Sequence, residues 1–218
     1  MEKELCKIGI KKAECGKLFY PAFKPSEPDG FPSIGARGCF LSHYKILKHA
    51  LDREKKNVLV MEDDLAISTQ IEKVSPELLK MLEIDTWGIA YLGHLEKIKN
   101  SEPYKLNLYR EPLLQSHFYA VNAKILPRLV NFLKTVLKRP PGHPDGGPMH
   151  YDGALSTFRA QNPDIETYLV LPSLGWQRSS RSDIYTKKWF DKHVLLAWIV
   201  SVGRKIKNVI RRLDNRFK

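Results

Sequence analysis

The stretch Asn57-Val-Leu-Val-Met-Glu-Asp-Asp-Leu65 joins four apolar residues directly to three carboxylates. A short, continuous apolar run is typical of a strand buried on both faces, as in the parallel sheet of an α/β domain. Ligands of such sheets bind in the crevice at the carboxyl ends of the strands. The sequence therefore predicts that Glu62, Asp63 and Asp64 lie at a ligand site.

Three adjacent carboxylates suit a metal ion. Neighbouring negative charges repel one another, and a hard divalent cation relieves that repulsion. Oxygen ligands of this kind favour Mg²⁺ or Mn²⁺, which in turn would hold a diphosphate. The competing interpretation is a solvated turn after a strand, because acidic residues are mostly exposed.

The composition is that of a globular protein in a reducing compartment. The 218 residues suffice for one α/β domain with a buried core, and 43% of them are hydrophobic. Cys6, Cys15 and Cys39 are few and irregularly spaced, so they predict neither a disulfide framework nor a four-ligand zinc site. We expect no signal peptide, and no apolar run approaches the ~20 residues that span a bilayer.

The net charge of +12 is concentrated in the last part of the chain. Residues 187–218 hold ten Lys or Arg against two acids, so they carry eight of the twelve excess charges. A basic chain raises the question of nucleic acid. Because the body is nearly balanced and has no recognisable nucleic-acid motif, we expect no nucleic-acid partner.

Helices are predicted to alternate with buried strands. Apolar residues at helical spacing predict helices over residues 38–51, 76–82, 123–137 and 151–160. Apolar runs predict strands over residues 58–61, 87–92, 117–121 and 166–171. Residues rich in Gly, Pro or polar side chains predict loops over residues 16–37, 139–149 and 172–184, and a loop or hairpin over residues 95–112. This alternation indicates an α/β fold with a mainly parallel sheet and helices on both faces.

The last segment is predicted to be a basic amphipathic helix. Apolar residues recur every three or four positions from Leu195 to Leu213, with Lys and Arg between them. Three roles compete: an anchor on an anionic membrane, a helix folded back on the body, and a short coiled coil. The excess of Lys and Arg favours the membrane surface. We therefore divide the chain into a domain over residues 1–186 and a tail over residues 187–218.

Several segments together resemble glycosyltransferase family 25, whose bacterial members act in lipopolysaccharide and lipooligosaccharide biosynthesis. The segments that carry the resemblance, in chain order, are Gly35-Ala-Arg-Gly-Cys-Phe-Leu-Ser-His-Tyr, Val58-Leu-Val-Met-Glu-Asp-Asp, Tyr91-Leu-Gly, Phe118-Tyr-Ala-Val-Asn-Ala-Lys, Tyr151-Asp and Pro172-Ser-Leu-Gly-Trp-Gln-Arg-Ser-Ser-Arg-Ser-Asp-Ile. The resemblance spans residues 9–184 and omits the tail.

The resemblance implies a GT-A-like, Rossmann-like fold and an inverting, metal-dependent transfer of a hexose, galactose or glucose, from a UDP-sugar to a saccharide acceptor. Asp64 matches the main Mn²⁺ or Mg²⁺ ligand of the family, and Glu62 is directed to the metal-bound water or the ribose. Asp63 is expected to contact the substrate. A single displacement needs one base, and Asp152 matches the family's aspartate. The competing role for Asp152 is a helix N-cap.

Further substrate contacts are expected from Ser42, His43, Gln177, Ser182 and Asp183. Ser42 and His43 would lie beneath the donor, or serve only as polar positions of a helix. The other three would bind donor or acceptor, or only hold their loop closed. The acceptor is expected to be a saccharide or a lipid-linked saccharide, which places the enzyme in the cytoplasm at the inner face of the membrane, with its basic tail on the anionic surface.

One departure from the family is marked. The first strand of the family, with its Asn-Leu turn and following Arg, has no counterpart here. Three explanations are open: a fragment or misassigned start, replacement of the strand by another segment, and impaired donor binding. The departure supports an alternative function, a catalytically degenerate transferase fold that acts as a membrane- or partner-binding module. Retention of the whole acid triplet, Glu62-Asp63-Asp64, favours the enzyme.

Overall fold

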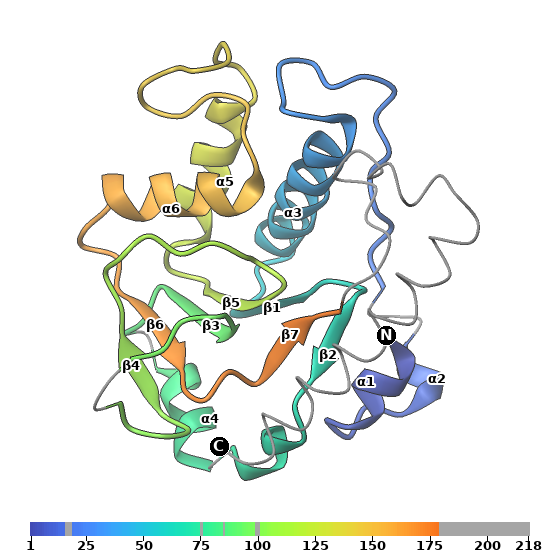
Figure 1. Ribbon diagram of the computed structural model, residues 1–218, viewed down its shortest axis with the longest axis vertical. Coiled ribbons are helices and arrows are strands. Elements are labelled where there is room, and N and C mark those ends of the chain that lie inside the picture. The colour runs from blue at the N-terminus through green and yellow to red at the C-terminus, as the bar shows by residue number, and fades with distance from the viewer. Residues whose placement is uncertain (16–18, 75, 85, 99–100, 179–218) are drawn as a thin grey trace, which may run out of the picture.

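The computed structural model describes residues 1–15, 19–74, 76–84, 86–98 and 101–178. These residues form a mixed α/β fold around one seven-stranded sheet (Figure 1). The strands are β1 (Asn57–Met61), β2 (Leu65–Ile67), β3 (Ile89–Gly93), β4 (Leu106–Leu108), β5 (Phe118–Asn122), β6 (Thr167–Val170) and β7 (Gly175–Gln177). The helices are α1 (Glu2–Cys6), α2 (Lys12–Cys15), α3 (Ile34–Asp52), the 3-10 helix η1 (Thr69–Lys73), α4 (Pro76–Glu83), α5 (Leu126–Val136) and α6 (Tyr151–Gln161). The predicted tail helix over residues 187–218 lies outside the described residues.

Most neighbouring strands run antiparallel, so the prediction of a mainly parallel sheet is wrong. Strands β1, β5, β3, β6 and β4 follow one another across the sheet, and β2 pairs with β7 beside them. The parallel pairs in the described residues both involve β3, with β6 and with β7. A stretch of apolar residues predicts a buried strand, but it does not indicate whether that strand is parallel or antiparallel to its neighbours. The chain returns from β3 to β5 without a crossover helix, so β5 lies antiparallel to both β3 and β1.

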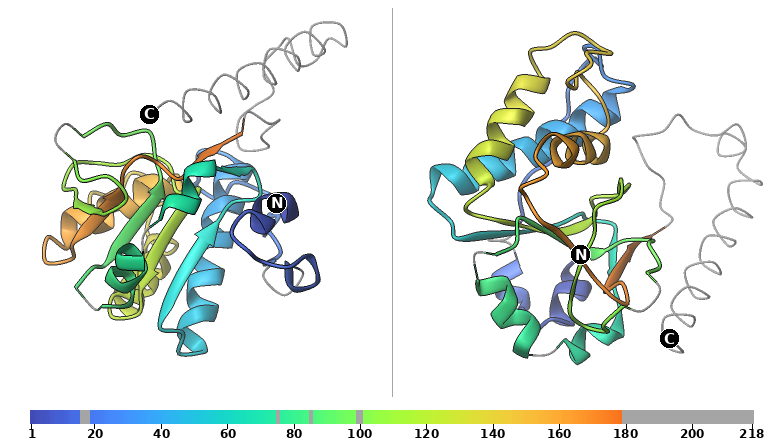
Figure 2. Two further views of the ribbon diagram at one scale, coloured as in Figure 1. Left: turned by 90° about the horizontal axis from the view of Figure 1, so that it is seen from below. Right: turned by 90° about the vertical axis from the view of Figure 1, so that its left-hand side faces the viewer.

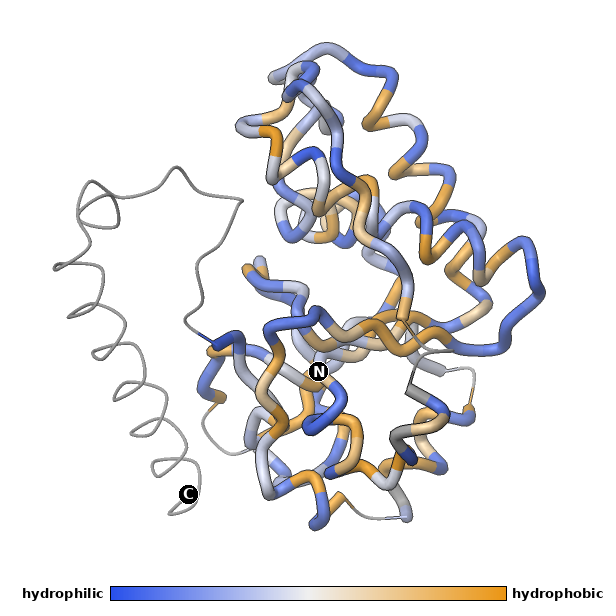
Figure 3. The backbone as a smooth tube through the Cα atoms, turned by 90° about the vertical axis from the view of Figure 1, so that its right-hand side faces the viewer, coloured by the Kyte–Doolittle hydropathy of each residue, from blue (hydrophilic) through white to orange (hydrophobic). Residues whose placement is uncertain are grey.

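Helices cover both faces of the sheet, as predicted. Helices α3, α5 and α6 lie on one face, and α1 and α4 lie on the other (Figure 2). Successive side chains of a strand point to opposite faces. Ile89 and Tyr91 of β3 therefore join the core beneath α3, α5 and α6, whereas Ala90 and Leu92 join the core on the side of α4. The helices alternate between apolar and polar residues (Figure 3), because each buries one side only.

Strand β1 lies at an edge of the sheet. Its partner among the described strands is β5. Val58 and Val60 are buried, whereas Leu59 between them is 45% exposed. The prediction that this strand is buried on both faces is therefore wrong, because an edge strand tolerates a partly exposed apolar residue. The three carboxylates of the acid triplet follow the end of this edge strand.

Helix α3 positions one side of the candidate site. It begins about one turn earlier than predicted, because the Oγ of Ser33 caps it by accepting a hydrogen bond from the backbone N–H of Ala36 (3.0 Å). Ala36, Phe40, His43 and Leu47 form its buried stripe. This spacing of four, three and four residues directs His43 toward the sheet. Neither α3 nor any other described helix combines the length and apolarity that crossing a bilayer requires.

Candidate active site

The acid triplet forms a turn between β1 and β2, which we call the acid turn (residues 62–64). The backbone N–H of Leu65 donates to the carbonyl of Glu62 (3.1 Å), which closes the turn. The backbone N–H of Glu62 donates to the carbonyl of His117 (2.9 Å), which continues the pairing of β1 with β5. The acid turn is therefore fixed at both ends by the sheet.

Strand β7 holds the acid turn from the other side. Gln177 lies opposite Leu65 in the β2–β7 pair, and its Nε2 donates to Oε2 of Glu62 (3.3 Å). Arg178 donates from its backbone N–H and its Nε to the carbonyl of Asp64 (2.9 and 3.1 Å). Its guanidinium also donates to the carbonyl of Asp63 (2.8 Å). The structure thus brings Gln177 to the acid turn, although the two are far apart in sequence.

Asp64 carries the feature most suggestive of a cation. Its Oδ1 is buried and has no hydrogen-bond partner among the described residues. Burial raises the pKa of the Asp64 carboxyl to about 6, and the negative charge of Glu62 adds to this effect, as does that of Asp63 to a smaller extent. A buried carboxylate oxygen with no partner is costly, and a divalent cation would satisfy it. The donor set of the acid turn therefore fits Mg²⁺ or Mn²⁺.

Glu62 is turned toward helix α3. Its Oε1 lies 3.3 Å from Nε2 of His43, and its side chain is 20% exposed. Burial opposes ionisation of Glu62, but the hydrogen bond and charge of His43 outweigh burial and lower the pKa of the carboxyl. The pKa of His43 rises to about 9, because its interactions with Cys39 and Glu62 outweigh the burial that disfavours the imidazolium. The two side chains form a partly buried ion pair.

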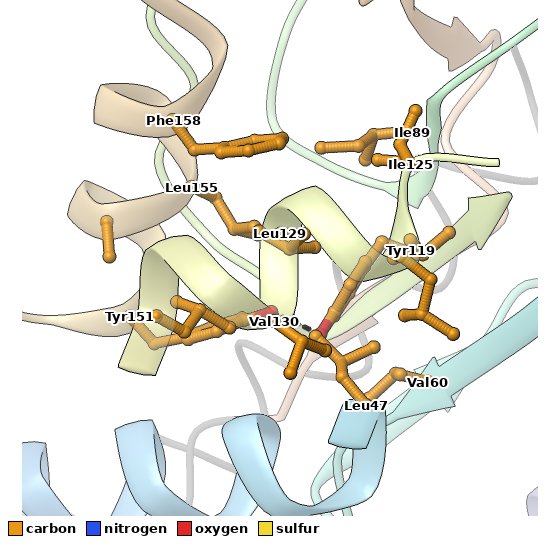
Figure 4. Close-up of a cluster of buried hydrophobic side chains, with 14 of the residues drawn as sticks. Leu47, Val60, Ile89, Tyr119, Ile125, Leu129, Val130, Tyr151, Leu155 and Phe158 are labelled. Atoms are coloured by element: carbon orange, nitrogen blue, oxygen red, sulfur yellow. Dashed lines mark hydrogen bonds between the residues drawn. The ribbon is translucent and has the colours of Figure 1, made fainter. Parts of the chain in front are cut away.

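Aromatic rings enclose His43. The Tyr151 ring stacks on the imidazole, with centroids 4.0 Å apart and an angle of 14° between the planes. The hydroxyl of Tyr119 lies 2.9 Å from Nδ1 of His43 and 2.8 Å from the hydroxyl of Tyr151. Figure 4 shows the bond between the two tyrosines within the core beneath α3, α5 and α6. His43 therefore contacts Glu62 from within the core. Its place beneath the donor stays a prediction.

Ser42 fastens a loop to helix α3. Its Oγ donates to the carbonyl of Gly38 (2.7 Å) and accepts from the backbone N–H of Phe23 (2.8 Å). The hydroxyl thus ties the segment before α3 to the helix. These hydrogen bonds fit a structural role for Ser42 as a polar position of the helix. A contact between Ser42 and the substrate remains a prediction.

Asp152 lies in the first turn of α6 rather than at the N-cap, which is His150. Its Oδ2 accepts from the backbone N–H of Gln115 (3.1 Å), and its Oδ1 accepts from that of Gly153 (2.8 Å). Gln115 has a φ of 87°, a conformation that is uncommon for a residue with a side chain. Asp152 therefore anchors the turn that precedes β5. Its role as the base stays a prediction.

The structure gathers only some of the predicted site residues. His43, Glu62, Asp63, Asp64 and Gln177 meet at the acid turn. Ser42 and Asp152 bond instead to the backbone segments described above. The predicted contacts of Ser182 and Asp183 lie outside the described residues.

Sequence reasoning missed two groups that shape the site. Arg178 follows Gln177 directly, and only the pairing of β2 with β7 reveals that it holds the acid turn. Tyr119 and Tyr151 lie in segments that carried the family resemblance, but their contact with His43 depends on the packing of α3 and α6 on β5. These contacts have no local signal in the sequence, because each of them joins segments that are distant along the chain.

Comparison with known proteins gives one family. The model of glycosyltransferase family 25 (LPS biosynthesis protein) matches residues 29–138. Human procollagen galactosyltransferase 2 is 38% identical over 76 residues, which cover 33% of this chain and 12% of the human protein. A glycosyltransferase 25 family member of Drosophila pseudoobscura pseudoobscura is 28% identical over 92 residues, or 42% of this chain and 15% of the fly protein. The human inactive glycosyltransferase 25 family member 3 is 36% identical over 61 residues, 27% of this chain and 10% of that relative.

Proposed function

Because the chain belongs to glycosyltransferase family 25, we propose that it transfers a hexose from a UDP-sugar to a saccharide acceptor. The observation that carries the proposal is the acid turn, where a buried oxygen of Asp64 has no partner in the described part of the chain. A diphosphate held through a divalent cation would occupy this place. The name of the human relative, a procollagen galactosyltransferase, favours galactose over glucose as the sugar.

Mn²⁺ or Mg²⁺ is the proposed cofactor. Asp64 would be its main ligand, since its Oδ1 is buried without a partner in the described structure. Glu62 is turned away toward His43, which suits contact with the metal-bound water or with the ribose rather than direct ligation. When bound, the ion supplies positive charge beside the diphosphate that leaves. Asp63, which is exposed, is available to substrate.

The residues of the chain itself would position the reactants. Arg178 fixes the backbone of Asp63 and Asp64, and so keeps the acid turn in one conformation. Gln177 and His43 hold the carboxylate of Glu62 between them. In an inverting displacement Asp152 would take the proton of the acceptor hydroxyl as the new glycosidic bond forms. Its two hydrogen bonds leave further lone pairs of the carboxylate free to accept that proton.

The acceptor is proposed to be a saccharide of lipopolysaccharide, lipooligosaccharide or a related glycan. The description of the matching family as an LPS biosynthesis protein supports this class. A lipid-linked acceptor would explain the basic tail. Residues 187–218 would hold the enzyme against the anionic inner face of the membrane, where such an acceptor lies. The proposed location is therefore cytoplasmic and peripheral.

A second candidate function is a degenerate transferase fold that binds a membrane or a partner. The similarity to the human inactive family member favours it. Strand β1, next to the acid turn, lies at a sheet edge in the described structure and leaves Leu59 45% exposed, which also suits a changed donor site. The complete acid turn and its support by His43 and Gln177 favour the enzyme.

The test is calorimetric titration of UDP-galactose and UDP-glucose with and without Mn²⁺. We expect Mn²⁺-dependent binding that is lost in Asp64→Asn. The matched control is Asp145→Asn, which changes an exposed aspartate in the loop between α5 and α6 and should bind the donor as the wild type does. A folded wild-type protein that binds neither donor would refute the transferase and favour the binding module.

A further inference from the structure

A second cluster of metal-ligating groups shares Glu62 with the acid turn and extends from it into the protein. Cys39 and His43 are one helical turn apart on α3, and Glu62 faces them from the end of β1. The thiol of Cys39, a ring nitrogen of His43 and a carboxylate oxygen of Glu62 all lie within 4.8 Å of one another. His43 is buried, and Cys39 and Glu62 are partly buried.

The distance between His43 and Glu62 fits two ligands of one shared cation. Ligand atoms about 2.0 Å from a tetrahedral zinc ion lie roughly 3.3 Å from each other. Nε2 of His43 and Oε1 of Glu62 are 3.3 Å apart. A hydrogen bond of this length is long, whereas two ligands of one metal ion have this separation. The distance therefore suits a metal at least as well as a proton.

The tyrosines around His43 resemble the outer shell of a metal site. Histidine ligands usually bond through their second nitrogen to a neighbouring group, which fixes the tautomer and the ring orientation. Nδ1 of His43 contacts the hydroxyl of Tyr119, which in turn bonds to the hydroxyl of Tyr151. If Nδ1 carries the proton of a neutral ring, Nε2 presents its lone pair to the carboxylate of Glu62. A metal ion between these two lone pairs would take the place that the proton on Nε2 occupies in the metal-free ion pair.

We propose that Cys39, His43 and Glu62 bind one zinc ion. The thiolate selects this site for a thiophilic ion such as Zn²⁺, whereas the oxygen ligands around Asp64 suit a hard ion. Binding would release the thiol proton of Cys39 and any proton on Nε2 of His43 to solvent. The ion would hold helix α3 to the end of β1 and fix the direction of Glu62. Solvent would supply the fourth ligand, because Cys39 and Glu62 are partly exposed.

The site was not foreseen from the sequence. The irregular spacing of the three cysteines predicted no four-ligand zinc site and made zinc improbable. The proposed site needs only one cysteine, with one histidine and one glutamate. Cys39 and His43 alone, four residues apart on a helix, are too common a pattern to indicate a metal. Glu62 completes the set only because β1 and α3 pack together.

The test uses cobalt as a spectroscopic substitute for zinc in a protein that keeps one thiol. The chain has three cysteines, so the double variant Cys6→Ser/Cys15→Ser leaves only Cys39. We expect one equivalent of Co²⁺ to produce a thiolate-to-cobalt absorption band in the near ultraviolet. Adding Cys39→Ser should abolish the band and weaken binding at least 100-fold. Tyr119→Phe should weaken it about 10-fold, as for other outer-shell groups.

Two controls separate this proposal from the proposed function. The band should persist in the background of Asp64→Asn, which removes the main ligand of the Mn²⁺ site. It should also form whether or not the protein binds a UDP-sugar. A band of unchanged strength after Cys39→Ser, or no band in the protein that retains Cys39, would overturn the zinc site and leave the ion pair in its place.

A second measurement does not depend on the folding of a Cys39 variant. In the single-thiol protein, one equivalent of Zn²⁺ should slow alkylation of Cys39 at least tenfold, because a metal-bound thiolate is shielded. An unchanged rate of alkylation would overturn the proposal.

Discussion

The partly buried pair of His43 and Glu62 makes the stability of the metal-free protein depend on pH. The pKa of His43 is raised from about 6.5 to about 9 in the folded protein. A group whose pKa is raised by folding stabilises fully below its unfolded pKa, and this stabilisation is lost as the pH rises through the folded pKa. The free energy of unfolding should therefore fall between pH 6.5 and pH 9.

The size of this effect follows from the shift. Each unit of pKa corresponds to about 1.4 kcal/mol, so the raised pKa of His43 predicts a loss of about 3 kcal/mol across the interval. Burial lowers the pKa of His94 and His117. Their titration therefore changes the free energy of unfolding at pH values below this interval. The pKa of Asp64 is raised only to about 6, so this carboxyl is largely ionised over most of the pH interval. His43 should dominate between neutral pH and pH 9.

Urea unfolding with a metal chelator present, at a series of pH values between 6.5 and 9, measures the loss. The matched variant is Glu62→Gln, which keeps the shape of the side chain but removes the charge that helps to raise the pKa of His43. We expect the variant to show a flatter profile, in which the interactions with Cys39 still help to raise the pKa of His43. The ion pair would be refuted as the source of the pH dependence in two cases: if the free energy of unfolding changed equally with pH in both proteins, or if it did not change with pH in the wild type.

Three further predictions use other parts of the molecule. Asp64→Asn should stabilise the metal-free protein above pH 6, because burial already penalises the charged carboxyl, and a lower melting temperature in the variant would contradict this. Asp152→Asn should reduce the transfer rate at least 100-fold with donor affinity within twofold, whereas a wild-type rate would restrict Asp152 to anchoring Gln115. Deletion of residues 187–218 should release the protein from anionic vesicles at low salt, and unchanged co-sedimentation would disprove the anchor.

The local pattern of apolar residues was sufficient to locate most helices and buried strands. Helix α6 covers residues 151–161 against a predicted 151–160, and α4 covers residues 76–83 against a predicted 76–82. Such elements depend on which residues recur along a few turns of chain. The short strands β2, β4 and β7 were not predicted, because three residues are too few to show a period.

The prediction of a ligand site after Met61 also rests on local sequence, because three adjacent carboxylates at the end of an apolar run are a local signal. The direction of the neighbouring strand β5 was not readable, since an apolar strand looks the same in either direction. The contacts of Glu62 with His43 and Gln177 likewise join residues that are 19 and 115 positions away. Local sequence fixes periodicity and chemistry, whereas strand direction and the pairing of distant charges arise only when the whole core packs.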